Sequence, residues 1–298
     1  MLDFITVSDP DTRLDKLLAC HYSNFSRSYF QYLILQGAVL VNDEVVKKSC
    51  KLKIGDEIQV HFILTKEIAL EPENIVLDIL YEDEHLIAVN KPAGLVVHPA
   101  VGNWTGTFVN ALLYHCKHIE RDDSLRPGIV HRLDKETSGV LIAAKNQAMH
   151  QALTELFSER KIEKRYIAVC KGRPSVTTID APIGRHPTQR KLMTVCETGK
   201  HAKTHIQVRA SNGVFSVLEI GLETGRTHQI RVHLKHIGHP LVGDPVYGTV
   251  AFNDRFAIDR QMLHAMSLSF IHPVTKEPLV INARLPDDIA QVVTKISS

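Results

Sequence analysis

The chain has 298 residues, of which 44% are hydrophobic and 23% are charged, and its formal net charge is +2 at pH 7. This profile is that of a globular protein with a sizeable core, and the length favours two domains. No apolar run approaches the roughly 20 residues that span a bilayer, and the start MLDFITVSDP lacks the basic and apolar regions of a signal peptide. The five cysteines are dispersed, which indicates reduced thiols in a cytosol. We therefore expect a cytoplasmic protein without a membrane segment.

Residues 11–65 predict a small unit of two helices and short strands. Apolar residues fall at helical spacing in TRLDKLLACHY and in SRSYFQYLILQG, where Gly37 provides a C-terminal stop. VLVNDEVV predicts a hairpin that turns at Asn42 and Asp43, and KIGDEIQVHF predicts one more strand.

The remainder of the chain predicts a larger mixed domain. A polar stretch at 67–76 reads as a linker between the small unit at 1–66 and a domain at 77–298. Short β-like runs then recur, and helical spacing appears at 146–159 and 227–237. Strands and helices do not alternate regularly, so we predict an α+β fold with a mainly antiparallel, mixed β-sheet flanked by helices and loops.

Positive charge is concentrated between residues 158 and 209, which hold twelve Lys or Arg and four Asp or Glu. Such a local excess is typical of a surface that contacts a polyanion. It is equally typical of a solvated face. The cations considered for RNA contact in this stretch are Lys161, Lys164, Arg165, Arg185, Arg190 and Lys191.

The segment HRLDKETSG (131–139) places one polar group of almost every kind between two apolar runs. Asp134 is its candidate for chemistry. In an ordinary polar turn, Asp134 would pair with Arg132 or Lys135 or cap the residues that follow. Alternatively, these cationic neighbours keep the carboxylate ionised, and an ionised, positioned carboxylate can act as a nucleophile or stabilise a cationic sugar centre.

The segment GRTHQIRVHLKHIGHP (225–240) is rich in arginine and histidine. On a helix, its histidines at 233, 236 and 239 step by three and drift round the axis, with no cysteine or acid among them, which disfavours zinc. Arg226 and Arg231 fit an anion better, because a guanidinium matches phosphate and carboxylate geometry. The alternative is an exposed amphipathic helix with partly buried apolar residues.

Tyr166 opens the strand KRYIAVCKG within the basic stretch. A tyrosine in a strand is usually a core or rim residue, but it can also stack on a base drawn out of RNA. The loop NKPAGLVVHP (90–99) can shape a pocket wall and carries no chemistry of its own. Dinucleotide, P-loop and nucleophile-elbow motifs are absent, so the sequence marks no nucleotide cofactor and no acyl-enzyme.

Taken in order, GIVHRLDKETSGVLIAAK, KRYIAVCKG and GRTHQIRVHLKHIGHPLVGDPVYG resemble the three motif regions of the RluA family of pseudouridine synthases. YEDEHLIAVNKPAGLVVHP and LHAMSLSFIHP also resemble that family, and the N-terminal unit resembles an S4 RNA-binding domain. The resemblance covers nearly the whole chain, and the pairing of HRLD with GRTHQIR is specific.

The resemblance implies conversion of uridine to pseudouridine in RNA of the large ribosomal subunit, either naked or in an assembling particle. The N1–C1′ bond breaks, uracil rotates and C5 rejoins C1′. Asp134 matches the family's catalytic Asp and Tyr166 its pocket tyrosine. Arg231 matches the basic residue that pairs with the Asp, and Arg226 is the less favoured candidate for that pairing. Arg132 would face the RNA.

The reaction also sets the expected inventory of the site. Because the base must be retained, a second carboxylate that activates water would be harmful, and one indispensable Asp suffices. The family resemblance calls for no metal and no cofactor.

The S4-like unit would add affinity for RNA. Its expected RNA-facing cations are Arg27, Lys47, Lys48, Lys51 and Lys53, and Arg27 opens a helix whose backbone N–H groups can meet phosphate. Tethering this unit raises the local concentration of the catalytic domain near its RNA. We expect a monomer.

Two other functions stay open on the sequence alone. A non-catalytic S4-type RNA-binding protein of ribosome assembly would use the same basic surface but would tolerate Asp134→Asn. A histidine-metal hydrolase would need bound zinc and would lose its activity with a chelator.

Overall fold

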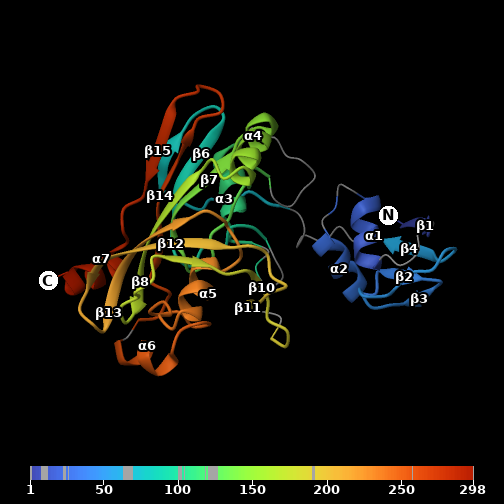
Figure 1. Ribbon diagram of the computed structural model, residues 1–298. Coiled ribbons are helices and arrows are strands. Elements are labelled where there is room, and N and C mark those ends of the chain that lie inside the picture. Colours follow the sequence, from blue (N-terminus) through green and yellow to red (C-terminus); the bar gives the residue numbers. More distant parts are fainter. Residues whose placement is uncertain are drawn as a thin grey trace. The chain divides into compact units, whose positions relative to one another are not determined.

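The computed structural model describes residues 2–7, 13–22, 25, 27–62, 70–99, 103, 105–117, 119, 127–189, 192–256 and 258–297. The chain divides into two compact units (Figure 1). One comprises Met1–Ile75 and His98–Pro127, and the other comprises Val76–Val97 and Gly128–Ser298. Of the cations predicted to contact RNA, Arg190 and Lys191 lie outside the described residues.

The N-terminal unit combines helices with a four-stranded antiparallel sheet in the order β1-β4-β2-β3. Its elements are β1 (Leu2–Thr6), α1 (Leu14–His21), α2 (Arg27–Leu35), β2 (Val39–Val41), β3 (Glu44–Val45), β4 (Glu57–His61) and α3 (Phe108–His115). The two predicted helices, the hairpin and the strand after it are confirmed. The sequence does not predict β1, in which only Ile5 is buried.

The turns of this unit follow the sequence closely. Gly37 has φ 69° just after α2, the left-handed conformation that ends a helix. Asn42 and Asp43 have φ 52° and 64°, as a two-residue type I′ hairpin turn requires. Residues 67–69 of the expected linker lie outside the described residues. Of the rest, Glu71 accepts a hydrogen bond from the side chain of Asn110 in α3.

The larger unit is built on a nine-stranded sheet in the order β5-β6-β7-β14-β8-β13-β12-β9, with β15 also paired to β14. The strands are antiparallel except for β7 and β14, so the predicted α+β fold with a mainly antiparallel, mixed sheet is confirmed. Their bounds are β5 (Ile79–Glu82), β6 (Leu86–Lys91), β7 (Ser138–Ala144), β8 (Glu163–Lys171), β9 (Thr178–Asp180), β12 (Lys203–Ser211), β13 (Phe215–Leu222), β14 (Leu263–Ile271) and β15 (Pro278–Asn282). A separate hairpin joins β10 (Ile183–Arg185) and β11 (Met193–Val195).

The helices in the described part of this unit are α4 (Gln147–Ser158), α5 (Gln229–His236), α6 (Val250–Phe256) and α7 (Asp287–Ser297). The predicted helices at 146–159 and 227–237 correspond to α4 and α5. Leu153 of α4 packs with Val140 and Ile142 of β7 in one core, and Ile289 of α7 packs with Val169 in another. None of the helices in the described ranges combines the length and the apolar character needed to cross a bilayer.

The strand β7 begins directly after the turn that carries Asp134, and Gly139 sets how closely it approaches β14. Ser138 and Gly139 pair with His264 and Ala265 of β14. Gly139 has φ 114°, and a Cβ at this position would lie 2.2 Å from the carbonyl oxygen of Ala265. The glycine of the HRLDKETSG segment is therefore required for the only parallel pairing among the described strands of this sheet.

Candidate active site

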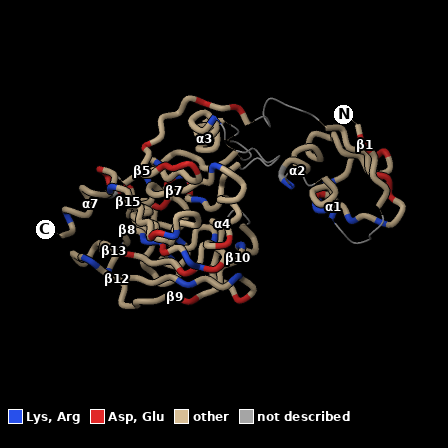
Figure 2. The backbone as a smooth tube through the Cα atoms, turned by 90° about the horizontal axis from the view of Figure 1, so that it is seen from above, with Lys and Arg blue, Asp and Glu red and all other residues tan. Residues whose placement is uncertain are grey.

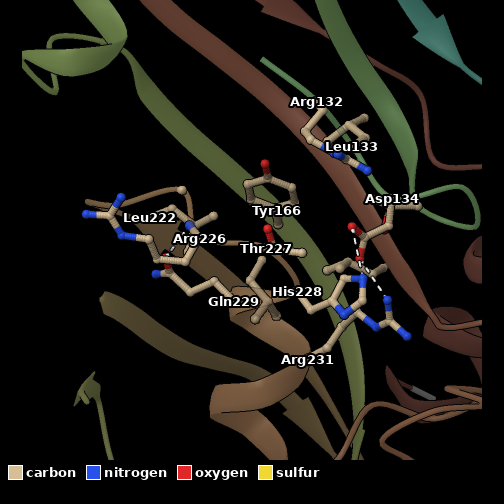
Figure 3. Close-up of a pocket in the computed structure, with 14 residues that line it drawn as sticks. Arg132, Leu133, Asp134, Tyr166, Leu222, Arg226, Thr227, His228, Gln229 and Arg231 are labelled. Carbon is tan, nitrogen blue, oxygen red and sulfur yellow. Dashed lines mark hydrogen bonds and ion pairs between the residues drawn. The ribbon is translucent and has the colours of Figure 1, made fainter. Parts of the chain in front are cut away.

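A pocket in the larger unit brings together all three motif segments (Figure 3). The 132–137 turn, Tyr166 of β8 and residues 225–231 at the start of α5 line it, and it encloses about 580 Å³ of space that is partly open to solvent. These segments are far apart in the sequence. The central strands β7, β14 and β8, which are neighbours in the sheet, bring the first two together.

Asp134 is one of the residues that line this pocket. Its Oδ2 accepts a hydrogen bond of 2.9 Å from Nη1 of Arg231, and its side chain keeps 19% exposure. Nε2 of His228 lies 3.8 Å from Oδ1 on the other side of the carboxylate. The carboxyl group is thus held by a guanidinium, and it still lines the open space of the pocket.

Arg231 is fixed in turn by a second carboxylate, that of Asp244. Nε and Nη2 of Arg231 donate to Oδ2 and Oδ1 of Asp244 at 2.7 and 3.0 Å. Both residues are buried, and Asp244 also accepts the backbone N–H groups of Val246 and Tyr247. One planar guanidinium therefore joins two carboxylates, and only Asp134 faces the pocket.

The electrostatics of this cluster favour the charged forms. Burial lowers the pKa of Arg231, but the two carboxylates outweigh it and hold the pKa above its usual value. Burial raises the pKa of Asp244, but the hydrogen bonds and charge of Arg231 outweigh it and hold the pKa below its usual range. The sequence argument did not identify Asp244. In the sequence, Asp244 is visible as the aspartate of GDPVYG, shortly after the helix that carries Arg231.

Tyr166 faces the same pocket from β8 and is 9% exposed. Burial raises its pKa, and the negative charge of Asp134 raises the pKa further, so the phenol stays protonated at neutral pH. Its ring adjoins the space beside Asp134 (Figure 3). A flat base that enters the pocket would meet this ring.

His228 is a pocket residue that the sequence argument missed. It precedes α5 with φ 56° and ψ 22°, a left-handed backbone that few residues other than glycine adopt. Its Nδ1 lies 2.9 Å from the hydroxyl of Tyr247, which also accepts the backbone N–H of Met193. The ring of Tyr247 lies 5.0 Å from the guanidinium carbon of Arg231, at cation–π distance.

The turn that carries Asp134 is anchored from behind by Lys91. This lysine is fully buried, and its Nζ donates to the carbonyl oxygens of Pro92, Leu95 and Lys135 at 2.8, 2.9 and 3.0 Å. The loop at 90–99 thus contributes a support to the site rather than chemistry.

Later residues of the same turn are anchored by β14 and by the residues that lead into it. Arg260 donates to the carbonyl oxygen of Glu136, and Gln261 donates to the hydroxyl of Thr137. Ser138 is hydrogen-bonded to His264 at 2.9 Å. The backbone next to Asp134 is therefore held at consecutive positions.

Arg226 and Arg132 occupy different places from Arg231. Nε of Arg226 donates to the carbonyl oxygen of His201 at 3.0 Å, and Arg226 does not contact Asp134. Arg132 is exposed at the pocket wall. The structure therefore brings Arg231 to Asp134 and leaves the other two arginines at the rim.

The helix α5 is not the exposed amphipathic helix of the alternative interpretation, because Gln229 to Leu234 are all buried. Its histidines have separate partners. His233 is hydrogen-bonded to the hydroxyl of Thr204 and to the carbonyl of Ala181, whereas His236 is exposed. His239 is hydrogen-bonded to the carbonyl of Lys171.

The cations expected to meet RNA in and near β8 and in β10 have mixed surroundings. Lys161 is exposed and pairs with Glu159 at 2.7 Å. Arg165 pairs with both Glu163 and Glu219 at 2.6 Å, and positive and negative positions are interspersed along this part of the sheet (Figure 2). Arg185 is exposed at the end of β10.

Lys164 departs from the expectation of a surface cation. It is 8% exposed, because alternation along β8 points it to the same covered face as Tyr166. Burial, together with the charge of Arg160, lowers its pKa.

In the N-terminal unit, Arg27 is held by a buried acid. Asp15 has no exposed side-chain surface and accepts hydrogen bonds from Arg27, Arg13 and Gln31. Lys47 and Lys48 are exposed after the hairpin.

Models of two protein families match the chain. The RNA pseudouridylate synthase model matches residues 85–236, and the S4 domain model matches residues 12–58. An uncharacterized RNA pseudouridine synthase of Bacillus subtilis is 44% identical over 95% of this chain and 94% of its own length. The ribosomal large subunit pseudouridine synthase D of Neisseria meningitidis serogroup A is 45% identical over 95% of this chain and 78% of its own length.

A solved structure of a related protein has a similar fold. The structure of human RNA pseudouridylate synthase domain containing 1 superposes with a TM-score of 0.58 at 28% identity, over 75% of this chain and 96% of that one. The family model spans the pocket residues from Arg132 to Arg231, and the relatives and the fold point to the same family. The chain therefore belongs to the RNA pseudouridylate synthase family, whose members are enzymes that isomerise uridine in RNA.

Proposed function

We propose that this enzyme isomerises specific uridines in large-subunit ribosomal RNA, and that Asp134 is its single catalytic carboxylate. The observation that carries the proposal is that Asp134 is the only Asp or Glu among the described residues that line the pocket. Breaking the N1–C1′ bond builds positive charge on the sugar, and one carboxylate can stabilise or trap it. A second carboxylate beside it would activate water and release the base instead.

The neighbouring side chains take complementary roles. The flipped uracil stacks on Tyr166, whose protonated phenol adds no competing charge. Arg231 keeps Asp134 oriented through their 2.9 Å hydrogen bond. Arg132 and Arg226, at the rim, meet RNA near the space left by the flipped nucleotide. All of these steps use side chains of the protein and need no metal or cofactor.

The RNA target is inferred from relatives and from the domain organisation. Several relatives of similar length are named ribosomal large subunit pseudouridine synthase D. We assign residues 1–66 to an S4 domain that holds RNA near the catalytic domain at 77–298, with 67–76 as the connection. The cations that we place on the RNA surface first are Lys47, Lys48 and Arg185, which are exposed to solvent. The protein acts as a monomer on ribosomal RNA in the cytoplasm.

The test is tritium release from ribosomal RNA labelled with 5-³H-uridine, because rejoining at C5 expels the hydrogen on that carbon. We expect release with the wild type and none above background with Asp134→Asn, whose amide cannot carry charge. RNA affinity of the variant should stay near that of the wild type. Release by Asp134→Asn would remove Asp134 from its role, and no release by the wild type on large-subunit RNA would remove the proposed substrate.

A further inference from the structure

One oxygen of Asp134 accepts no hydrogen bond from any residue that the structure describes. Oδ2 accepts the hydrogen bond from Arg231, whereas no donor among the described residues lies within hydrogen-bond distance of Oδ1. Nε2 of His228 lies across a gap of 3.8 Å, which is too long for a direct hydrogen bond. Both residues line the same open space, so one ligand oxygen placed there can contact Oδ1 and Nε2 together.

The tautomer of His228 depends on its hydrogen bond with Tyr247. The hydroxyl oxygen of Tyr247 accepts the backbone N–H of Met193, so its own proton is free to point at Nδ1 of His228. In a neutral imidazole whose Nδ1 accepts, the proton sits on Nε2. Burial lowers the pKa of His228, which keeps the ring neutral at physiological pH. With Tyr247 as the donor to Nδ1, the gap is lined by an acceptor, Oδ1, and a donor, Nε2–H.

The backbone of His228 also indicates a functional constraint. A left-handed conformation at a non-glycine residue costs free energy, and such outliers gather at sites where a side chain must be held in one direction. Here the conformation directs the imidazole toward Asp134 (Figure 3).

The stereochemistry of ribose identifies the oxygen that fits the gap. In a β-ribonucleoside the base and the 2′-hydroxyl project from opposite faces of the sugar ring. A carboxylate that acts on C1′ opposite the departing base therefore meets the 2′-hydroxyl, which is attached to the adjacent carbon. This hydroxyl is both a donor and an acceptor, and it distinguishes RNA from DNA.

We propose that the 2′-hydroxyl of the target uridine donates to Oδ1 of Asp134 and accepts from Nε2–H of His228, so that this pair selects ribose over deoxyribose. His228 is then a specificity-determining residue that contacts the substrate. The inference rests on the function proposed above for Asp134, and it adds the group that recognises the sugar.

The test compares two RNA substrates that differ only at one modified uridine, which carries either ribose or 2′-deoxyribose. Single-turnover rate constants are measured by tritium release with wild type, His228→Gly and His228→Asn. Glycine and asparagine both tolerate the left-handed backbone, so the fold around position 228 is kept. His236→Asn, on the exposed end of α5, serves as the matched control.

We expect the ribose-to-deoxyribose ratio of rate constants to be about 10-fold larger for the wild type and His236→Asn than for either variant at 228, the effect of one hydrogen bond. The intrinsic reactivity of the deoxynucleoside is the same with every protein and cancels in this comparison. Equal ratios for wild type and both variants would overturn the role of His228 alone. Failure of the wild type to act on the ribose substrate would overturn the proposed function and this inference with it.

Discussion

Asp244 holds Arg231 through two hydrogen bonds, while the same guanidinium makes a single bond to Asp134. The fully buried acid therefore sets the position of the arginine, and the arginine sets that of the carboxylate in the pocket. This arrangement makes Asp244 a positioning residue that does not face the substrate.

Asp244→Asn should lower the single-turnover rate constant about 10- to 100-fold with little change in RNA affinity. The amide of asparagine turns a donor toward the N–H groups of Arg231, and the guanidinium is then displaced from Asp134. Breaking a buried charge pair also costs about 3–5 kcal/mol of stability. Rate constants are measured at a temperature where circular dichroism shows both proteins to be folded.

Glu219→Gln is the control for Asp244→Asn, since Glu219 also pairs with two arginines, Arg165 and Arg209, but does not line the pocket. Its rate constant should stay within about threefold of the wild type, as expected for an ion pair at the surface. An Asp244→Asn enzyme with an unchanged rate constant would contradict the positioning role.

Lys91 gives a prediction about pH. Burial lowers its pKa to about 7, although Glu136 and Asp134 oppose the shift. Above pH 7 the folded protein releases a proton that the unfolded chain keeps up to its ordinary pKa near 10.4. The unfolding free energy contributed by Lys91 therefore rises with pH across this window, by up to about 1.4 kcal/mol per pH unit, and is flat below it.

The measurement for Lys91 is denaturant unfolding of wild type and Lys91→Met at pH 6, 8 and 9. The stability difference, wild type minus variant, should increase from pH 6 to pH 9. Lys171→Met removes an exposed lysine and provides the comparison. A difference that stays constant or decreases over this range would show that the buried group does not titrate there.

The buried acid of the N-terminal unit predicts a local effect. Burial raises the pKa of Asp15, but the hydrogen bonds from Gln31, Arg27 and Arg13 outweigh it and leave the pKa below its usual value. Asp15→Asn should destabilise this unit by about 3 kcal/mol, because it leaves charged donors without their acceptor. Hydrogen exchange should accelerate at Leu18 and Leu33 and stay unchanged at Val169 of the larger unit.

Asp56→Asn is the control within the same unit, since Asp56 is partly exposed and bonds to Lys53 and Asn42 at the surface. The free energy of unfolding of this variant should stay close to that of the wild type. Equal acceleration in the two variants would mean that burial of Asp15 has no special effect.

Local signals in the sequence predict most of the fold around the site. Apolar periodicity identifies α1, α2, α4 and α5, and the Asn42–Asp43 turn identifies the hairpin, because each depends on neighbouring residues only. The strand β1 is missed because a single buried side chain leaves no alternation to detect.

The site is predictable where a motif carries it and not where its partners are remote. Asp134, Tyr166 and Arg231 come from three quoted motifs, and the structure places them around one pocket. Asp244 and Lys91 act through contacts made by a loop and by a fully buried amine, which local patterns do not encode. Lys164 shows the converse error. A lysine within a basic stretch is predicted to be exposed, but the side chain of Lys164 lies on the buried face of its strand.

Gly139 connects the pairing of β7 with β14 to the position of Asp134. A methyl group there would lie 2.2 Å from the carbonyl oxygen and 2.6 Å from the nitrogen of Ala265, in a backbone with φ 114°. Gly139→Ala should force β7 away from β14, cost about 3 kcal/mol or more, and lower the rate constant by displacing Asp134. Gly213→Ala is the matched control, since Gly213 has φ 84° with no atom within 4 Å of the added carbon. It should cost only about 1 kcal/mol for the backbone conformation and leave the rate constant unchanged. Thermal unfolding and tritium release on both variants decide the matter, and equal effects at the two glycines would mean that close packing of β7 on β14 does not position the site.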